Sequence, residues 1–74
     1  MLYIADFGNH RVVKWSPQAT AGVVVAGGNG EGHNTHQLGS PSDLAADSEG
    51  GLYVLETTNA RVTRWGPGPT LEIS

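Results

Sequence analysis

Two histidines spaced three residues apart are the side chains of this chain best suited to binding a metal ion. They are His33 and His36 of the stretch GHNTH, and Glu31 precedes them. A zinc site needs three or four ligands that converge from fixed positions. Two imidazoles and one carboxylate on a Gly-rich stretch do not meet this requirement. We therefore expect a solvated loop here and no metal ligands.

Two other stretches suggest a phosphate or a calcium ion. GGNGEG at residues 27–32 is glycine-rich, but it lacks the Gly-Lys-Ser/Thr and the following helix of a Walker motif. Asp43, Asp47 and Glu49 could supply carboxylates to calcium, but their spacing is not that of an EF-hand. Asp47-Ser-Glu-Gly is typical of a turn. We expect neither ligand, and no cofactor.

Composition excludes several classes of function. No serine lies in a Gly-x-Ser-x-Gly context or a comparable one, so we expect no catalytic residue and no enzyme. The chain has four Lys and Arg residues against seven Asp and Glu residues, and its net charge of −3 disfavours binding to nucleic acid. No apolar run approaches the roughly 20 residues of a membrane span. Cysteine is absent, which excludes disulfides. The sequence indicates no compartment.

An internal repeat is the strongest signal in the sequence. NHRVVKW at residues 9–15 returns as NARVTRW at residues 59–65. A shift of fifty positions gives eight identities in 24 positions: Leu2/Leu52, Tyr3/Tyr53, Asn9/Asn59, Arg11/Arg61, Val12/Val62, Trp15/Trp65, Pro17/Pro67 and Thr20/Thr70. Conservative pairs are Ile4/Val54, Asp6/Glu56, Lys14/Arg64 and Val23/Ile73. A repeat of this length indicates a supersecondary unit that cannot bury its apolar faces alone.

The elements that position these residues are predicted to be β-strands. Gly and Pro leave no helix of useful length. Runs of alternating or β-branched residues predict strands at 2–6, 11–15, 22–27, 43–47, 52–56, 61–65 and 70–74. Four antiparallel strands per 40–50 residues are typical of a β-propeller blade. The chain therefore reads as strands b-c-d and then a-b-c-d: an incomplete first blade at 1–27, a Gly-rich inter-blade loop at 28–42 and a second blade at 43–74.

The stretch LYIADFGNHRVVKW resembles an NHL repeat. The matching residues are Tyr3, Asp6, Gly8, Asn9, His10, Arg11 and Val12, and VVVAGGNGEGHNTHQLGSPSDLAAD is similar to the inter-blade segment of such proteins. The second copy keeps the asparagine and the arginine but has Glu56, Thr58 and Ala60 in place of Asp6, Gly8 and His10. The resemblance implies an NHL-type propeller, typically with six blades, of which this chain holds fewer than two.

Two sets of residues are predicted to matter. The first is a structural turn motif, in which the acid pairs with the arginine across the hairpin and Gly8 and Asn9 supply positive φ angles; it comprises Asp6, Gly8, Asn9, Arg11, Glu56, Asn59 and Arg61. The second is an aromatic set for inter-blade packing: Tyr3, Trp15, Tyr53 and Trp65. The blade cores and inter-blade faces are expected to use these tryptophans and Leu2, Ile4, Val12, Val24, Leu44, Leu52, Val54 and Val62.

These expectations predict a non-enzymatic propeller fragment that self-assembles into a multi-blade ring. Three chains would give six blades through a repeated heterologous interface. The first blade lacks a strand a, which either stays missing or comes from another chain. The ring would present its loops to a protein or a small-molecule ligand. Alternatives are part of an NHL-type lyase or metal-dependent hydrolase, whose ligands come from several blades, an RNA-binding NHL propeller, or an engineered or truncated fragment.

Overall fold

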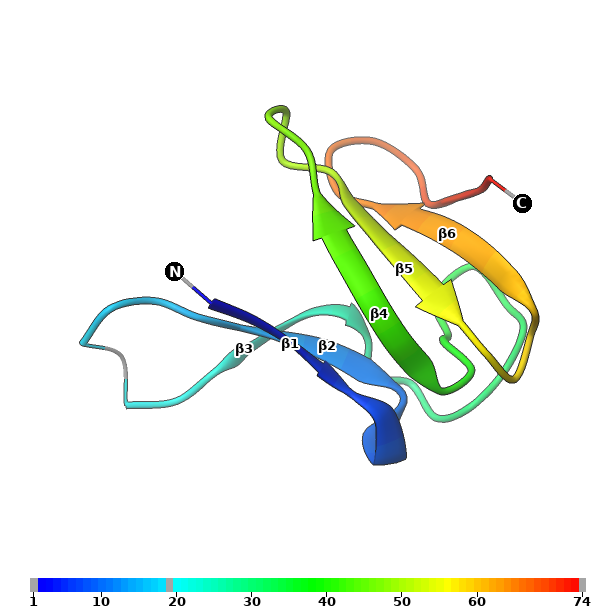
Figure 1. The fold of residues 1–74 in the computed structure, drawn as a ribbon, viewed down its shortest axis with the longest axis horizontal. Helices are drawn as coiled ribbons and strands as arrows, with labels where there is room; N and C mark the ends of the chain where they lie inside the picture. Colours follow the sequence, from blue (N-terminus) through cyan, green and yellow to red (C-terminus); the bar gives the residue numbers. More distant parts are fainter. Residues whose placement is uncertain (1, 19, 74) are drawn as a thin grey trace.

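The chain forms two antiparallel β-sheets in the computed structural model, which describes residues 2–18 and 20–73 (Figure 1). The first sheet has the order β1-β2-β3 and contains β1 (Leu2–Asp6), β2 (Arg11–Trp15) and β3 (Val23–Gly27). The second has the order β4-β5-β6-β7 and contains β4 (Pro41–Ala46), β5 (Leu52–Glu56), β6 (Arg61–Trp65) and β7 (Leu71–Glu72). A 3₁₀ turn, η1 (Phe7–Asn9), joins β1 to β2. The predicted all-β class is confirmed.

The four strands of the two repeated hairpins begin and end at the predicted residues, whereas the other three strands have different bounds. The strand predicted at 22–27 begins at Val23, and the one predicted at 43–47 runs over Pro41–Ala46, with an irregular register between Pro41 and Asp43. The strand predicted at 70–74 shortens to Leu71–Glu72. Ser74, the last residue predicted for that strand, lies outside the described residues, as do Met1 and Ala19 of the predicted first unit.

The fifty-residue correspondence does not extend to the last strand of each unit. Lys14 pairs with Val23 in the first sheet, but Arg64 pairs with Leu71 in the second. The connection before the last strand spans residues 16–22 in the first unit and 66–70 in the second. The inferred equivalence of Val23 and Ile73 is therefore wrong by two positions, because the second connection is shorter.

The core lies between the two sheets, where β1 and β4 contact each other. It contains Val12 and Ala26 from the first sheet, Leu52 and Val54 from the second, and Leu38 from the segment that joins them. The Cα radius of gyration is 11.4 Å, close to the ~11 Å expected of a compact chain of this length. The two sheets thus pack as one body around a small core.

Three residues expected in the blade cores or inter-blade faces are exposed in the single chain. Leu2, Ile4 and Val24 lie on the face of the first sheet that points away from the second sheet. Side chains alternate between the two faces of a strand, so Ile4 cannot contact the face that Tyr3 and Val12 turn toward the core. Leu2, Ile4 and Val24 are therefore not core residues of the isolated chain, and their expected place in an inter-blade face stays a prediction.

The first sheet ends at β1, whose second edge pairs with no other strand within residues 2–18 and 20–73. This edge is the position that a strand a would occupy in a four-stranded sheet. Unpaired N–H and C=O groups therefore line one side of the first sheet.

Candidate functional site

A buried polar cluster, which we call the occupied triad, lies at one end of the second sheet and consists of Glu56, Asn59 and Arg61. The register of β5 and β6 places Glu56 opposite Arg61, and Asn59 lies in the turn between them. Arg61 Nε donates to Glu56 Oε2 at 3.0 Å, and Asn59 Nδ2 donates to Glu56 Oε1 at 2.8 Å. Hydrogen-bonded charge pairs of this kind are the form in which ionised side chains tolerate burial.

Glu56 is fully buried, and its carboxylate accepts two more hydrogen bonds. They come from the Thr63 hydroxyl at 2.6 Å and from the Gly39 amide at 3.0 Å. Burial by itself raises the pKa of Glu56, but the donors Arg61, Thr63, Asn59 and the Gly39 amide outweigh it and hold that pKa below its ordinary value. Among the described residues, every buried side-chain nitrogen and oxygen atom has a partner.

The segment at residues 32–40, which we call the linker segment, covers the occupied triad. Asn59 Nδ2 donates to the Gly32 carbonyl at 2.9 Å. Arg61 donates through Nη1 to the carbonyl of His33 at 3.1 Å and through Nη2 to that of Gln37 at 3.3 Å. The linker segment is therefore held through its backbone, while its one fully buried side chain, Leu38, enters the core.

The first sheet carries the same arrangement in exposed form, which we call the open triad: Asp6, Asn9 and Arg11. Arg11 Nε donates to Asp6 Oδ2 at 2.8 Å, and Asn9 Nδ2 donates to the same oxygen at 3.0 Å. The Arg11 side chain is 40% exposed and that of Asp6 is 28%, against 6% for Arg61 and 0% for Glu56. Hydrogen bonds from Asn9 and Arg11 lower the pKa of Asp6. Both predicted acid–arginine pairs are thus present, one covered and one open.

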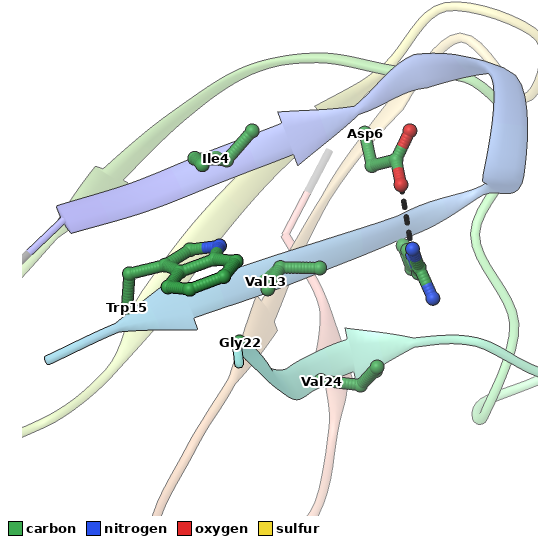
Figure 2. Close-up of a pocket in the computed structure, with 7 residues that line it drawn as sticks. Ile4, Asp6, Val13, Trp15, Gly22 and Val24 are labelled. Carbon is green, nitrogen blue, oxygen red and sulfur yellow. Dashed lines mark hydrogen bonds and ion pairs between the residues drawn. The ribbon is translucent and has the colours of Figure 1, made fainter. Parts of the chain in front are cut away.

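A shallow pocket adjoins the open triad on what we call the front face of the first sheet. Figure 2 shows the pocket, and its lining is Ile4, Asp6, Arg11, Val13, Trp15, Gly22 and Val24. Trp15 lies over Gly22, where an added Cβ would come within 2.8 Å of the indole nitrogen. The front face is therefore an apolar surface with an ion pair at one end.

The second sheet exposes an apolar surface on its opposite side, which we call the back face. A shallow pocket there is lined by Asp43, Leu44, Ala45, Tyr53, Leu55 and Val62. The repeat aligns Tyr53 and Val62 with Tyr3 and Val12, which face the second sheet in the core. The back face of the second sheet thus matches the surface that the first sheet already uses for packing.

The four aromatic residues predicted for inter-blade packing divide between these surfaces. Tyr3 and Trp65 pack against the core between the two sheets. Trp15 lies on the front face and Tyr53 on the back face, where the Arg64 guanidinium is 5.8 Å from the centre of its ring. The structure therefore brings one aromatic from each sheet together and leaves the other two on open surfaces.

The left-handed residue of each hairpin turn is not the one predicted. His10 has φ 53° and Ala60 has φ 49°, whereas Gly8 and Asn9 have no positive φ. The prediction for Gly8 and Asn9 is wrong, because the Asn9 side chain binds Asp6 and the reversal occurs one residue later. His10 Nδ1 also accepts a hydrogen bond from the Ser40 amide at 3.0 Å, which anchors the start of β4.

The other candidate ligands stay apart. Glu31, His33 and His36 are exposed, and the residues described contain no cluster of three groups able to hold a metal ion. Asp47 accepts hydrogen bonds from the Glu49 and Gly51 amides, as its turn interpretation requires. No helix in the described part of the chain is long and apolar enough to cross a membrane.

Sequence reasoning missed the residues that complete the occupied triad. Thr63 follows Arg61 by two positions, so strand alternation alone places it on the same face as Glu56. The roles of His10, Leu38 and the Gly39 amide depend on the path of the linker segment, for which the sequence holds no local signal. The residues that join the two units were therefore the ones left unassigned.

Searches for related proteins found no match among protein-family models, curated proteins or solved structures.

Proposed function

We propose that this chain is a non-enzymatic, NHL-type β-propeller fragment that self-assembles into a ring of blades and acts as a structural and protein-interaction module. Each of its two sheets would be a blade. Three copies would supply six blades, and the ring would expose its turns and the linker segment to a protein or small-molecule ligand.

One observation supports this proposal. Each sheet buries one face in the contact between the two sheets and leaves exposed the face that is equivalent to the buried face of the other sheet. Inside the chain, the Tyr3 and Val12 side of the first sheet packs on the Leu52 and Val54 side of the second. The repeat makes the open back face equivalent to the former side and the open front face equivalent to the latter. A second copy can therefore place its front face on the back face of the first and repeat the internal contact.

The exposure of these faces favours burial by another copy. Ile4 on the front face is 40% exposed and Leu55 on the back face is 43% exposed. Contiguous apolar surfaces of this kind mark interaction sites. An interface between two different faces of identical copies closes into a ring when its rotation allows, which is the geometry that propeller blades require.

Molar mass in solution tests the proposal. Light scattering of the full chain is expected to give an integral multiple of 7.7 kDa, with three as the multiple for a six-bladed ring. Ile4→Asp on the front face and Leu55→Asp on the back face should each abolish closed assemblies, because each places a charge in the interface. Ser48→Asp, in an exposed turn, adds the same charge as a control.

Two outcomes would contradict the proposal. One is a wild-type chain that is folded by circular dichroism and monomeric. The other is an oligomer whose mass is the same in both face variants. Circular dichroism of each variant separates loss of assembly from loss of folding.

A further inference from the structure

We propose that the open triad and the adjoining pocket form a binding site for a looped, Gly-containing peptide segment that carries one aliphatic side chain. This site goes beyond self-assembly, because its ligand is a length of peptide backbone and not the face of a sheet. Its expected ligand has the chemistry of the linker segment.

The occupied triad shows what such a ligand must offer. Every hydrogen bond from Asn59 and from the terminal nitrogens of Arg61 to the linker segment ends on a backbone carbonyl, and Glu56 accepts one backbone amide. Hydrogen bonds to backbone groups select the conformation of the peptide and not the identity of its side chains. Leu38 supplies the one side chain of the segment that is fully buried in the core, and the Gln37 side chain helps to hold the loop by donating to the Asn29 carbonyl.

The open triad has the same internal hydrogen bonds and lacks the peptide. Asn9 and Arg11 hold Asp6 as Asn59 and Arg61 hold Glu56. Within residues 2–18 and 20–73, no acceptor lies at the terminal nitrogens of Arg11, which correspond to the nitrogens that Arg61 uses on the linker segment. The fixed ion pair therefore presents free donors and a carboxylate in an orientation already used elsewhere in the chain.

The pocket beside the open triad provides the aliphatic subsite. Its volume is about 210 Å³, below the roughly 300–1,000 Å³ of sites for drug-sized ligands. Ile4, one of its lining residues, is the repeat equivalent of Val54, which shares the core with Leu38. The pocket thus suits one anchoring side chain next to a backbone clamp (Figure 2).

Peptide binding is compatible with assembly. Leu38 shares one core with residues of both sheets, Val12 and Val54, so a linker segment and a neighbouring sheet cover the same face together. A ring would therefore add a second wall to the aliphatic subsite, whereas the open triad offers its backbone hydrogen bonds with or without a neighbouring sheet.

Fluorescence anisotropy with a labelled synthetic peptide of residues 28–42, GNGEGHNTHQLGSPS, tests the site on the full chain. Saturable binding is expected. Arg11→Ala should weaken it roughly tenfold or more, because hydrogen bonds to a charged donor are lost. Lys14→Ala removes the same charge from the other face of β2 and should leave binding unchanged. A peptide with alanine in place of leucine should bind more weakly than the parent peptide.

Absence of saturable binding would overturn the inference, and so would equal binding to the wild type and to Arg11→Ala. The second result would indicate exchange of the peptide into the occupied triad. Light scattering on the same samples separates this inference from the proposed assembly. Binding by a monomeric chain supports the site and contradicts the ring, whereas a ring that binds no peptide does the reverse.

Discussion

At the scale of residues, one motif occurs in two environments, and burial decides what it does. Asp6 with Arg11 and Glu56 with Arg61 have nearly the same geometry. An exposed pair contributes little to stability, whereas removing one partner of a buried pair leaves an unpaired charge away from water. The buried pair therefore holds the linker segment between the two sheets, and the exposed pair remains available to a ligand.

The lowered pKa of Glu56 predicts a loss of stability in acid. A carboxylate whose folded pKa lies below its ordinary 4.5 stabilises the fold above that pH. The contribution is lost as pH falls below 4.5 through the lowered pKa. Urea unfolding at one protein concentration between pH 7 and pH 3 should show this decline, to which the lowered pKa values of Asp6 and Asp47 add.

Glu56→Gln is the control for that prediction. It should reduce the free energy of unfolding at pH 7 by about 3 kcal/mol, because Arg61 loses its buried counter-charge. It should also flatten the acid decline. A decline as steep as that of the wild type would show that Glu56 is not its source.

At the scale of elements, local sequence determines the two hairpins but not the path of the linker segment. Both hairpins follow from local alternation and turn residues, and the register of each agrees with the repeat. The linker segment has little strand structure of its own. Hydrogen bonds within the loop shape it, and Asn59 and Arg61 hold it against the second sheet. Its order is therefore a property of the assembled pair of sheets.

This difference explains how much the sequence could predict. The all-β class, the strand order and both acid–arginine pairs follow from periodicity and from the repeat. The positive φ at His10 does not, because the side chain of the preceding Asn9 bonds Asp6 and the reversal occurs one residue later. The hydrogen bond from the Ser40 amide to the His10 ring does not either, because it joins residues thirty positions apart. The covered face of the first sheet does not follow from the sequence for a related reason: alternation identifies two faces of a sheet but not which of them packs against the other sheet.

The left-handed turn at Ala60 predicts a stabilising substitution. A residue with a Cβ is strained at φ 49°, and glycine is not. Ala60→Gly should therefore raise the free energy of unfolding by about 1 kcal/mol. Ala46→Gly, at an exposed position of β4, should lower it by ~0.5–1 kcal/mol. Urea unfolding compares the two, and a loss of stability in both would contradict the turn assignment.

At the scale of the whole molecule, the two sheets contact each other through two different faces. The Tyr3 and Val12 side of the first sheet, the linker segment and the Leu52 and Val54 side of the second sheet share a single core. A contact between two different faces has a direction. It forms once inside the chain, and it leaves the front face of the first sheet and the back face of the second sheet uncovered.

This direction predicts complementation between two defective chains. Ile4→Asp should block the front face and leave the back face intact, and Leu55→Asp should do the opposite. An equimolar mixture should then form a dimer of one copy of each, whereas neither variant should dimerise alone. Sedimentation velocity can measure this. Dimers in either variant alone would show that the faces pair like with like, contrary to the proposed direction.

The free edge of β1 gives the chain a second way to pair with a copy of itself. Of its five residues only Asp6, the last, is charged, so the strand has little to prevent backbone pairing with a β1 from another copy. That contact would join the first sheets of two copies into one continuous sheet and stop at a dimer, because it uses up both β1 edges. The first step of either route joins two copies, so dilution slows both, and the free edge stays a competitor of the proposed assembly at any concentration.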